Sequence, residues 1–129
     1  MSEIRATTIS DLAGTGPATL TGQYAAKAWV NFNGTGTVAI RESGNVSSIT
    51  DNGTADYTLN FTTAQVDANY AVNGIIGLAS GLNFNFSALV SPTAFSYTAS
   101  SVRVRTPYAN GEGVMVAFDY DTVCFSITR

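Results

Sequence analysis

The sequence predicts an all-β protein, an antiparallel β-sandwich or jelly-roll-like fold of roughly nine or ten short strands with an extended N-terminal arm. Three observations support this fold class. Apolar and polar residues alternate with a period of two along most of the chain after residue 24. Asn-Gly steps and Gly-rich clusters interrupt the alternation at short, regular intervals. No segment has a convincing helical period, and no repeat of fixed length indicates a propeller or β-helix.

Residues 1–24 differ from the rest of the chain. They carry Gly14, Gly16 and Pro17 among Ser and Thr residues, and their periodicity is weak. We therefore expect an extended or loosely held arm, which either docks onto a neighbouring protein or is a frayed terminus. Residues 25–129 are expected to form a single β-sandwich domain, since a chain of 129 residues is large enough to bury a core of its own.

Strong alternation begins in the segment 27–32. Ala28, Val30 and Phe32 are expected on one face of a strand, with Trp29 on the opposite face. Further strands are expected at 38–40, 46–50 and 56–61.

Three turn clusters, at 33–36, 43–45 and 51–53, separate these strands. Glycine accepts a positive φ without penalty, and the step Asn52-Gly53 fits a type I′ hairpin turn. We therefore expect a hairpin with its tip at 51–53.

The second half of the chain carries similar signals. Residues 62–69 break the alternation and are expected to form a loop or one helical turn. Further strands are expected at 70–78, 82–88, 95–100, 102–105, 114–120 and 123–127. Pro107 has no N–H to donate and should end the pairing of the strand before it. The Gly-rich loop Tyr108–Gly113 follows.

Charge and composition exclude several classes of function. Charged residues make up 12% of the chain, about half the usual share, and the net charge is −3. A nucleic-acid partner would need a basic patch, so none is expected. The chain has no histidine, which removes the commonest general base and the commonest metal ligand. Its one cysteine, Cys124, cannot form an intrachain disulfide and is expected to be a buried, inert thiol.

No targeting or membrane-spanning segment is recognisable in the sequence. The start of the chain lacks a basic region followed by an apolar core, and the longest apolar piece, Tyr70–Leu78, is too short to span a bilayer. We expect a protein made in a cytoplasm without export and without insertion into a membrane.

Two groups of acidic residues resemble cation sites but are better explained as turns. Asp119–Asp121 resembles the start of a calcium loop, yet no Gly and Glu follow at the required spacing. Asp51, Asn52 and Asp56 could surround a cation, but turn chemistry accounts for them. No metal site and no cofactor is therefore predicted.

Catalysis by paired carboxylates is also not supported by the sequence. A glycoside hydrolase needs two carboxyl groups across one cleft, and nothing in the sequence places Glu42 and Glu112, or any of the aspartates, in this way. We predict no catalytic residue and no enzymatic activity.

Binding is better supported than catalysis. The loop after Pro107 carries Tyr108 and Asn110, and an aromatic ring can stack on a sugar face while an amide bonds to hydroxyls. Arg103 and Arg105 share a strand face just before this loop and could contact an anionic glycan or the carboxylate of a neighbouring subunit. A solvated edge face is the alternative for these arginines. The predicted receptor-binding loop therefore comprises Tyr108, Asn110, Arg103 and Arg105.

Trp29 is expected on the polar face of its strand, between Lys27 and Asn31. Exposed large aromatic side chains tend to mark contacts between proteins, so Trp29 is predicted to be a subunit contact. Burial against the second sheet or the N-terminal arm is the alternative.

Residues 27–72 resemble a stretch found in bacteriophage tail-fibre and related tail proteins. The stretch here begins KAWVNF, continues NGTGTVAIR and reaches NVSSITDNGTADYTLNFTT. It departs from the family pattern at Ala55 and Leu59, where the family has Gly and Val, and at the turn Glu42–Gly44. It covers over a third of the chain. The motif is structural and carries no known catalytic residue.

The resemblance implies a non-enzymatic virion protein, a β-rich domain near the end of a tail fibre or similar appendage. It also implies assembly as a homotrimer. Together with the arm and the loop residues described above, it leads us to expect contact with other virion proteins through residues 1–24 and recognition of a host-surface glycan. Its location would be the virion. Two alternatives stay open: a capsid decoration or head-fibre protein anchored through the same arm, and a glycan-hydrolysing tail protein.

Overall fold

The computed structural model describes residues 25–77 and 97–129, and within these ranges all regular structure is antiparallel β-strand. No helix in the described ranges is long and apolar enough to cross a membrane. The strands are β1 (Ala26–Asn33), β2 (Ala39–Gly44), β3 (Val46–Gly53), β4 (Asp56–Phe61), β5 (Ala71–Gly77), β6 (Ser101–Arg105), β7 (Tyr108–Ala109), β8 (Met115–Val116) and β9 (Thr122–Thr128).

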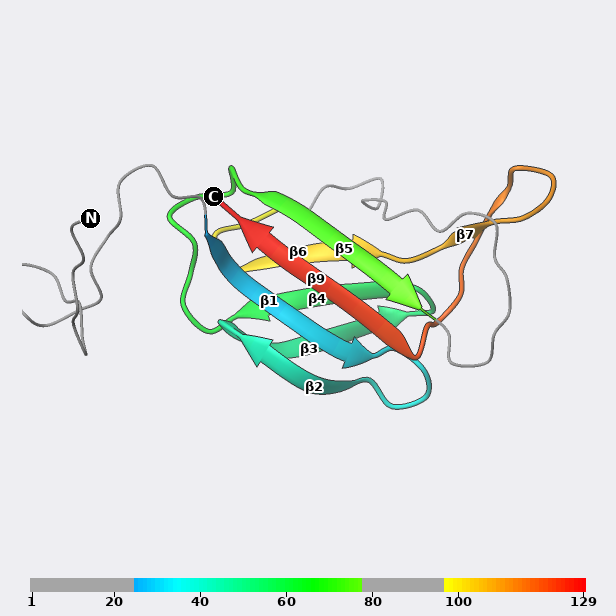
Figure 1. Ribbon diagram of the computed structural model, residues 1–129, viewed down its shortest axis with the longest axis horizontal. Helices are drawn as coiled ribbons and strands as arrows, with labels where there is room; N and C mark the ends of the chain where they lie inside the picture. The colour runs from blue at the N-terminus through cyan, green and yellow to red at the C-terminus, as the bar shows by residue number, and fades with distance from the viewer. Residues whose placement is uncertain (1–24, 78–96) are drawn as a thin grey trace, which may run out of the picture.

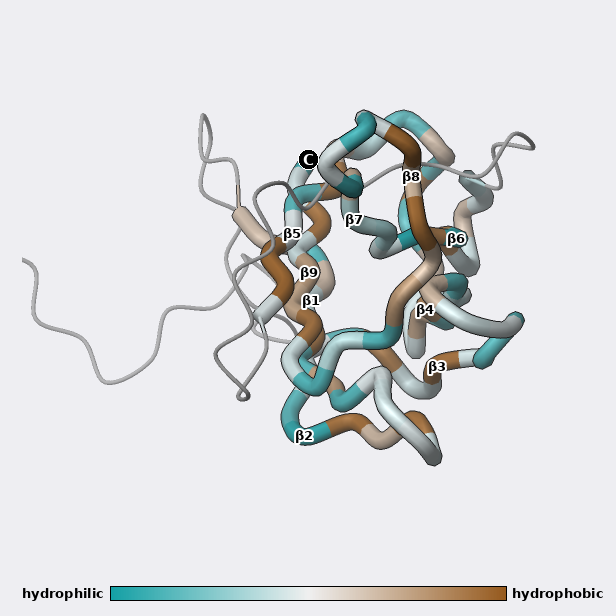
Figure 2. The backbone as a smooth tube through the Cα atoms, turned by 90° about the vertical axis from the view of Figure 1, so that its right-hand side faces the viewer, coloured by the Kyte–Doolittle hydropathy of each residue, from teal (hydrophilic) through white to brown (hydrophobic). Residues whose placement is uncertain are grey.

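The strands form two stacked sheets and a small hairpin. One sheet has four strands in the order β2-β1-β9-β5, the other has three in the order β3-β4-β6, and β7 pairs only with β8. The four-stranded sheet lies in front of the three-stranded one in Figure 1, and Figure 2 shows the two layers edge-on. This arrangement confirms the predicted antiparallel sandwich.

The core lies between the two layers because the inward side chains of β1, β4, β6 and β9 are apolar. On the four-stranded sheet the alternation predicted for β1 is confirmed, and β9 follows the same pattern of burial. The buried apolar residues of β1, β4, β6 and β9 are Ala28, Val30, Phe32, Tyr57, Leu59, Phe61, Val102, Val104, Val123, Phe125 and Ile127. Phe32 and Tyr57 join the layers edge to face, with ring centroids 5.1 Å apart. Burial of each Val, Leu, Ile or Phe side chain in this core contributes about 1.5–3 kcal/mol to stability.

A corner at Asn45 takes the chain from one sheet to the other. Asn45 has a φ of 57°, a conformation that asparagine tolerates better than most residues. Its side-chain amide donates to the carbonyls of Lys27 and Thr63, both at 3.0 Å, and accepts from the N–H of Thr63 at 2.7 Å. These bonds fix the point at which β2 ends in one layer and β3 begins in the other. The predicted turn at 43–45 is therefore a change of sheet.

The β3–β4 hairpin exists, but its turn lies two residues later than predicted. β3 continues through Gly53, and Thr54–Ala55 form the turn, with Ala55 at a φ of 60°. A register shift between Asp51 and Gly53 accommodates the extra length, and the Asp51 carboxylate accepts a bond from the N–H of Gly53 at 2.9 Å. Asn52 and Gly53 therefore lie in a β-bulge at the end of β3, before the turn.

Three further expectations from the sequence differ from the structure. The strand expected at 114–120 is reduced to β8, and it pairs with β7, which lies in the segment expected to be a loop. Of the strand expected at 95–100, the described part holds only an isolated bridge from Tyr97 to Val102. There the Thr98 hydroxyl accepts bonds from the N–H groups of Ser100 and Ser101, which turns the backbone.

Cys124 also differs from its prediction. It lies on the outer face of β9 and is only partly buried, because the inward positions of this strand are taken by its apolar neighbours. Residues 62–69 contain no strand, as expected. The arm 1–24 and the strand expected at 82–88 lie outside the described residues.

The sandwich has two different ends. At one end Ala26 pairs with Thr128, so the start of β1 lies beside the end of β9. The loops 34–38, 54–55 and 106–121 gather at the other end, which we call the hairpin pole because the β7–β8 hairpin extends from it (Figure 1).

Candidate functional site

The four residues of the predicted receptor-binding loop divide between the hairpin and the sheet beneath it. Tyr108 and Asn110 belong to the β7–β8 hairpin, and Arg103 and Arg105 lie on β6, whose end leads into that hairpin. The structure thus brings them to one end of the molecule. Each of the four also makes its own contacts within the chain, so their local roles differ.

Asn110 shapes the tip of the hairpin. Its side-chain oxygen accepts bonds from the N–H groups of Glu112 at 3.0 Å and Val114 at 2.9 Å. Its backbone N–H donates to the Val114 carbonyl, and its carbonyl accepts from Gly113, both at 2.9 Å. Gly113 has a φ of 76°, which glycine adopts without strain. The tip is therefore a defined turn.

Tyr108 is half buried at the base of the hairpin. Its ring meets Phe118 edge to face at 6.0 Å, and Phe118 in turn meets Tyr120 at 5.2 Å. This row of aromatic rings fastens the hairpin to the pole. A ring held in this way keeps its orientation for a ligand at little entropic cost.

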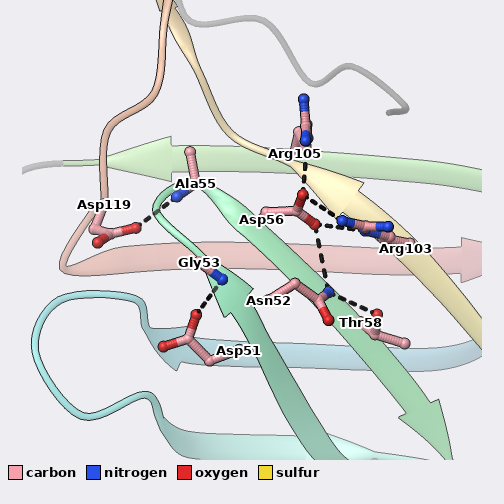
Figure 3. Close-up of polar contacts among 9 residues, drawn as sticks. All are labelled: Asp51, Asn52, Gly53, Ala55, Asp56, Thr58, Arg103, Arg105 and Asp119. Carbon is pink, nitrogen blue, oxygen red and sulfur yellow. Dashed lines mark hydrogen bonds and ion pairs between the residues drawn. The ribbon is translucent and has the colours of Figure 1, made fainter. Parts of the chain in front are cut away.

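Arg103 and Arg105 both bind the carboxylate of Asp56 on the neighbouring strand β4 (Figure 3). Arg103 makes a bidentate contact, with Nε 2.7 Å from Oδ1 and Nη2 2.7 Å from Oδ2, and Arg105 Nε lies 2.9 Å from Oδ2. Register explains the contact, because β4 pairs with β6 so that Asp56 lies opposite Arg105. Sequence reasoning placed the two arginines on one face but did not find their shared carboxylate.

The electrostatics of this cluster favour the charged carboxylate. The hydrogen bond from Arg103 holds the pKa of Asp56 below its ordinary value of 3.8, against the opposing effect of burial, and the Arg105 bond adds to this. Asp56 in turn raises the pKa of Arg103. The Asp56 side chain is only 7% exposed, whereas those of Arg103 and Arg105 are 34% and 46% exposed. The arginines therefore cover the carboxylate and present their own charge to solvent.

Polar bonds continue from this cluster across the outer face of the three-stranded sheet. Asn52 Nδ2 donates to Asp56 Oδ1 at 3.4 Å and to Thr58 Oγ1 at 2.9 Å. Asn60 Nδ2 donates to the hydroxyls of Ser48 at 3.1 Å and Thr50 at 3.0 Å. The sequence indicated a turn for Asp51, Asn52 and Asp56. In the structure Asp51 and Asn52 lie in β3, beside the bulge, and Asp56 lies in β4, where it pairs with the two arginines.

Asp119 ties the β3–β4 turn to the segment before β9. Its Oδ1 accepts bonds from the Ala55 N–H and the Tyr57 hydroxyl, both at 2.7 Å. Burial, together with the Asp119 carboxylate, raises the pKa of Tyr57 far above its ordinary value, so the phenol stays a donor. Sequence analysis missed this contact because Asp119 lies more than sixty residues from both partners along the chain. The local sequence around Asp119 resembled a calcium loop instead. Among the described residues, no three His, Cys, Asp or Glu residues gather to hold a metal ion.

A pocket of about 220 Å³ lies at the foot of the hairpin. It is lined by Thr54 and Ala55 of the β3–β4 turn, by Arg105, and by Pro107, Met115 and Ala117. Arg105 is the one charged residue among these. The pocket therefore combines an exposed guanidinium with largely apolar walls.

A second feature occupies the outer face of the four-stranded sheet. Trp29 is 41% exposed there, and Ile75 on β5 is 69% exposed. An open groove of about 490 Å³ runs across the sheet, and its lining residues, none of them charged, are Trp29, Val30, Asn31, Asn73, Gly74, Ile75, Cys124, Phe125 and Ser126. The indole lies against Gly44, where an added Cβ would be 2.3 Å from Nε1. Trp29 is thus on the polar face, as predicted, and forms one wall of the groove.

Comparison with family models, with curated proteins and with solved structures finds no match for this chain.

Proposed function

We propose that this chain is a non-enzymatic structural protein of a bacteriophage virion, part of a tail fibre or similar surface appendage, and that it contributes to recognition of a host-surface glycan. The resemblance of residues 27–72 to tail-fibre sequences carries the proposal. The hairpin pole, as a protruding end with an aromatic ring and an exposed guanidinium, supports the recognition part.

The two ends of the sandwich support a direction for the molecule in the virion. The described chain enters beside its own C-terminal strand, where Ala26 pairs with Thr128, and the hairpin extends from the far end. Attachment through residues 1–24 to another virion protein would then leave the hairpin pole facing outward. Loops on a rigid scaffold are the usual carriers of binding residues.

The two outer faces support a choice of subunit contact. The face of the three-stranded sheet presents hydroxyls, amides and the Asp56 cluster, all suited to water. The face of the four-stranded sheet presents Trp29 and Ile75 over an uncharged groove. Aromatic and apolar residues are enriched in the centres of interfaces, so we propose that this second face, with Trp29 in it, packs against other copies in a homotrimer.

The location of the protein in the particle tests the proposal. Phage particles purified from the strain that carries this gene are labelled with an antibody against the chain and viewed by electron microscopy. Label at the tail is the expected result. Label on the capsid shell would instead establish the decoration or head-fibre alternative. Particles that lack the protein altogether would contradict a virion role.

A glycan hydrolase is separated from a binding protein by a chemical assay. The purified chain is incubated with host polysaccharide, and reducing ends are measured over time. We expect no release above that from heat-denatured protein. Steady release would overturn the non-enzymatic part of the proposal.

A further inference from the structure

We propose that the pocket at the foot of the β7–β8 hairpin binds the carboxylate of an acidic sugar residue, such as a uronic acid, and that Arg105 holds the charge. The proposal goes further than the proposed function by naming a ligand chemistry and a pocket. It rests on that function only for the choice of a saccharide as the carrier of the carboxylate.

The geometry of Arg105 leaves part of its guanidinium available. Its Nε is bound to Asp56 Oδ2 at 2.9 Å, and in Figure 3 the group extends from that bond away from the carboxylate. The side chain is 46% exposed and lines the pocket. A guanidinium fixed at Nε presents its terminal N–H groups in a set direction, which suits a two-oxygen acceptor.

The charge of the cluster favours an acceptor with a single negative charge. Asp56 is shared by two guanidinium groups, so the three residues together carry one net positive charge. The carboxylate of Asp119 contacts the β3–β4 turn, and its Oδ1 already accepts hydrogen bonds from the Ala55 N–H and the Tyr57 hydroxyl. A carboxylate would balance the remaining charge, whereas a phosphate monoester, at about −1.5 to −2, would exceed it.

The walls and size of the pocket favour one sugar residue as the carrier. Met115, Pro107 and Ala117 offer apolar surface to the C–H face of a ring, and the Thr54 hydroxyl can bond a sugar hydroxyl. The volume of about 220 Å³ is below the roughly 300–1,000 Å³ of sites for drug-sized ligands. It therefore suits a single residue of a longer chain. None of the described residues that line the larger groove beside Trp29 is charged, so among them there is no such partner for a carboxylate.

Direct titration of the full chain with small probes tests the proposal. The probes are sodium glucuronate, glucose, sodium acetate, inorganic phosphate and a glutamate-containing tripeptide, followed by NMR shifts of backbone and arginine side-chain N–H groups. We expect glucuronate to bind roughly ten-fold more tightly than glucose or phosphate, with shifts at Thr54, Arg105 and Met115. Added salt should weaken this binding.

A matched pair of variants separates the pocket from the fold. Met115 is 45% exposed and lines the pocket, so Met115→Gln, which loses part of the apolar wall but adds no charge, is the reference for the affinity for glucuronate. Met115→Glu places a negative charge at the pocket and should lower that affinity roughly ten-fold. Arg105→Gln should abolish binding, while Arg41→Gln, whose guanidinium is bound to Asn31 and Phe32 instead, should not.

Three results would overturn the proposal. Equal affinities for glucuronate and glucose would show that charge does not contribute to binding. Equal affinities of the two Met115 variants for glucuronate would show that binding does not take place in this pocket. Tripeptide binding as tight as glucuronate would assign the carboxylate to a protein partner. None of these results bears on where the protein lies in the particle, so failure here is distinguishable from failure of the proposed function.

Discussion

At the scale of single residues, Asp56 is a buried carboxylate held by several neighbouring side chains. Its carboxylate is 7% exposed and accepts bonds from two arginines and, at longer range, one asparagine. A buried carboxylate is stable only when its lone pairs are used in this way. Asp56 is therefore structural, and its carboxylate fixes the positions of Arg103 and Arg105.

Asp56→Asn should lower the free energy of unfolding by about 2–3 kcal/mol, because two arginines lose their charged partner. The loss is no larger because both arginines remain partly solvated. Urea denaturation followed by tryptophan fluorescence measures the change. Asp67→Asn is the control, since that carboxylate pairs with Arg129 on the surface and should matter little. Equal effects of the two substitutions would contradict the structural role given to Asp56.

Stability should fall in acid, with a contribution from the same residue. The pKa of Asp56 is lowered in the folded state, so its ion pairs stabilise the protein at any pH above the ordinary value of 3.8. That contribution is lost as the pH falls from about 3.8 through the folded pKa. The free energy of unfolding of the wild type should therefore fall between pH 7 and pH 2, and this fall should be smaller in Asp56→Asn. Parallel curves for both proteins would rule out the linkage.

At the scale of elements, strand β5 shows how close packing restricts sequence. Gly74 lies opposite Phe125 of β9, and an added Cβ there would be 2.6 Å from the Phe125 ring and 2.8 Å from the Cys124 carbonyl. Gly77 on the same strand would place its Cβ 3.7 Å from Thr122, an ordinary contact. The first glycine is required by packing, and the second is not.

Gly74→Ala should therefore lower the free energy of unfolding by about 1–3 kcal/mol through overpacking. Gly77→Ala should be neutral or slightly stabilising, because alanine reduces the freedom of the unfolded chain. Thermal unfolding of the two variants beside the wild type measures both. If Gly77→Ala proved as harmful as Gly74→Ala, the packing described for β5 against β9 would be wrong.

The elements also show what local sequence can predict. Alternation in β1 and β9 identified which side chains face the core, since a strand with one buried face must alternate. It could not identify sheet partners, so the pairing of β4 with β6 and the Asp56 cluster that depends on it were not foreseen. The Asn52-Gly53 turn was misplaced because the contact of Asp119 with Ala55 fixes the turn two residues later. Such contacts between distant segments leave no local signal.

At the scale of the whole molecule, the two outer faces of the sandwich differ: one presents hydroxyls, amides and the Asp56 cluster, and the other presents Trp29 and Ile75 beside an open groove. We predict that the wild-type chain sediments as a trimer at micromolar concentration, and that Trp29→Gln shifts it toward monomer by about 2 kcal/mol or more per interface. Thr50→Gln, on the opposite face, is the control and should leave assembly unchanged. A stable monomeric wild type in sedimentation equilibrium would exclude the proposed assembly.

The central claim is that the hairpin pole meets the host surface, and competition for adsorption tests it most directly. Purified wild-type chain is added to host cells before phage, and the fraction of phage adsorbed is counted. We predict that the wild-type chain and Tyr108→Phe both reduce phage adsorption. Tyr108→Ala, once a thermal unfolding transition has shown that it is folded, should inhibit adsorption at least several-fold less. Equal inhibition by Tyr108→Ala and the wild type, or no inhibition by the wild type at all, would contradict the account.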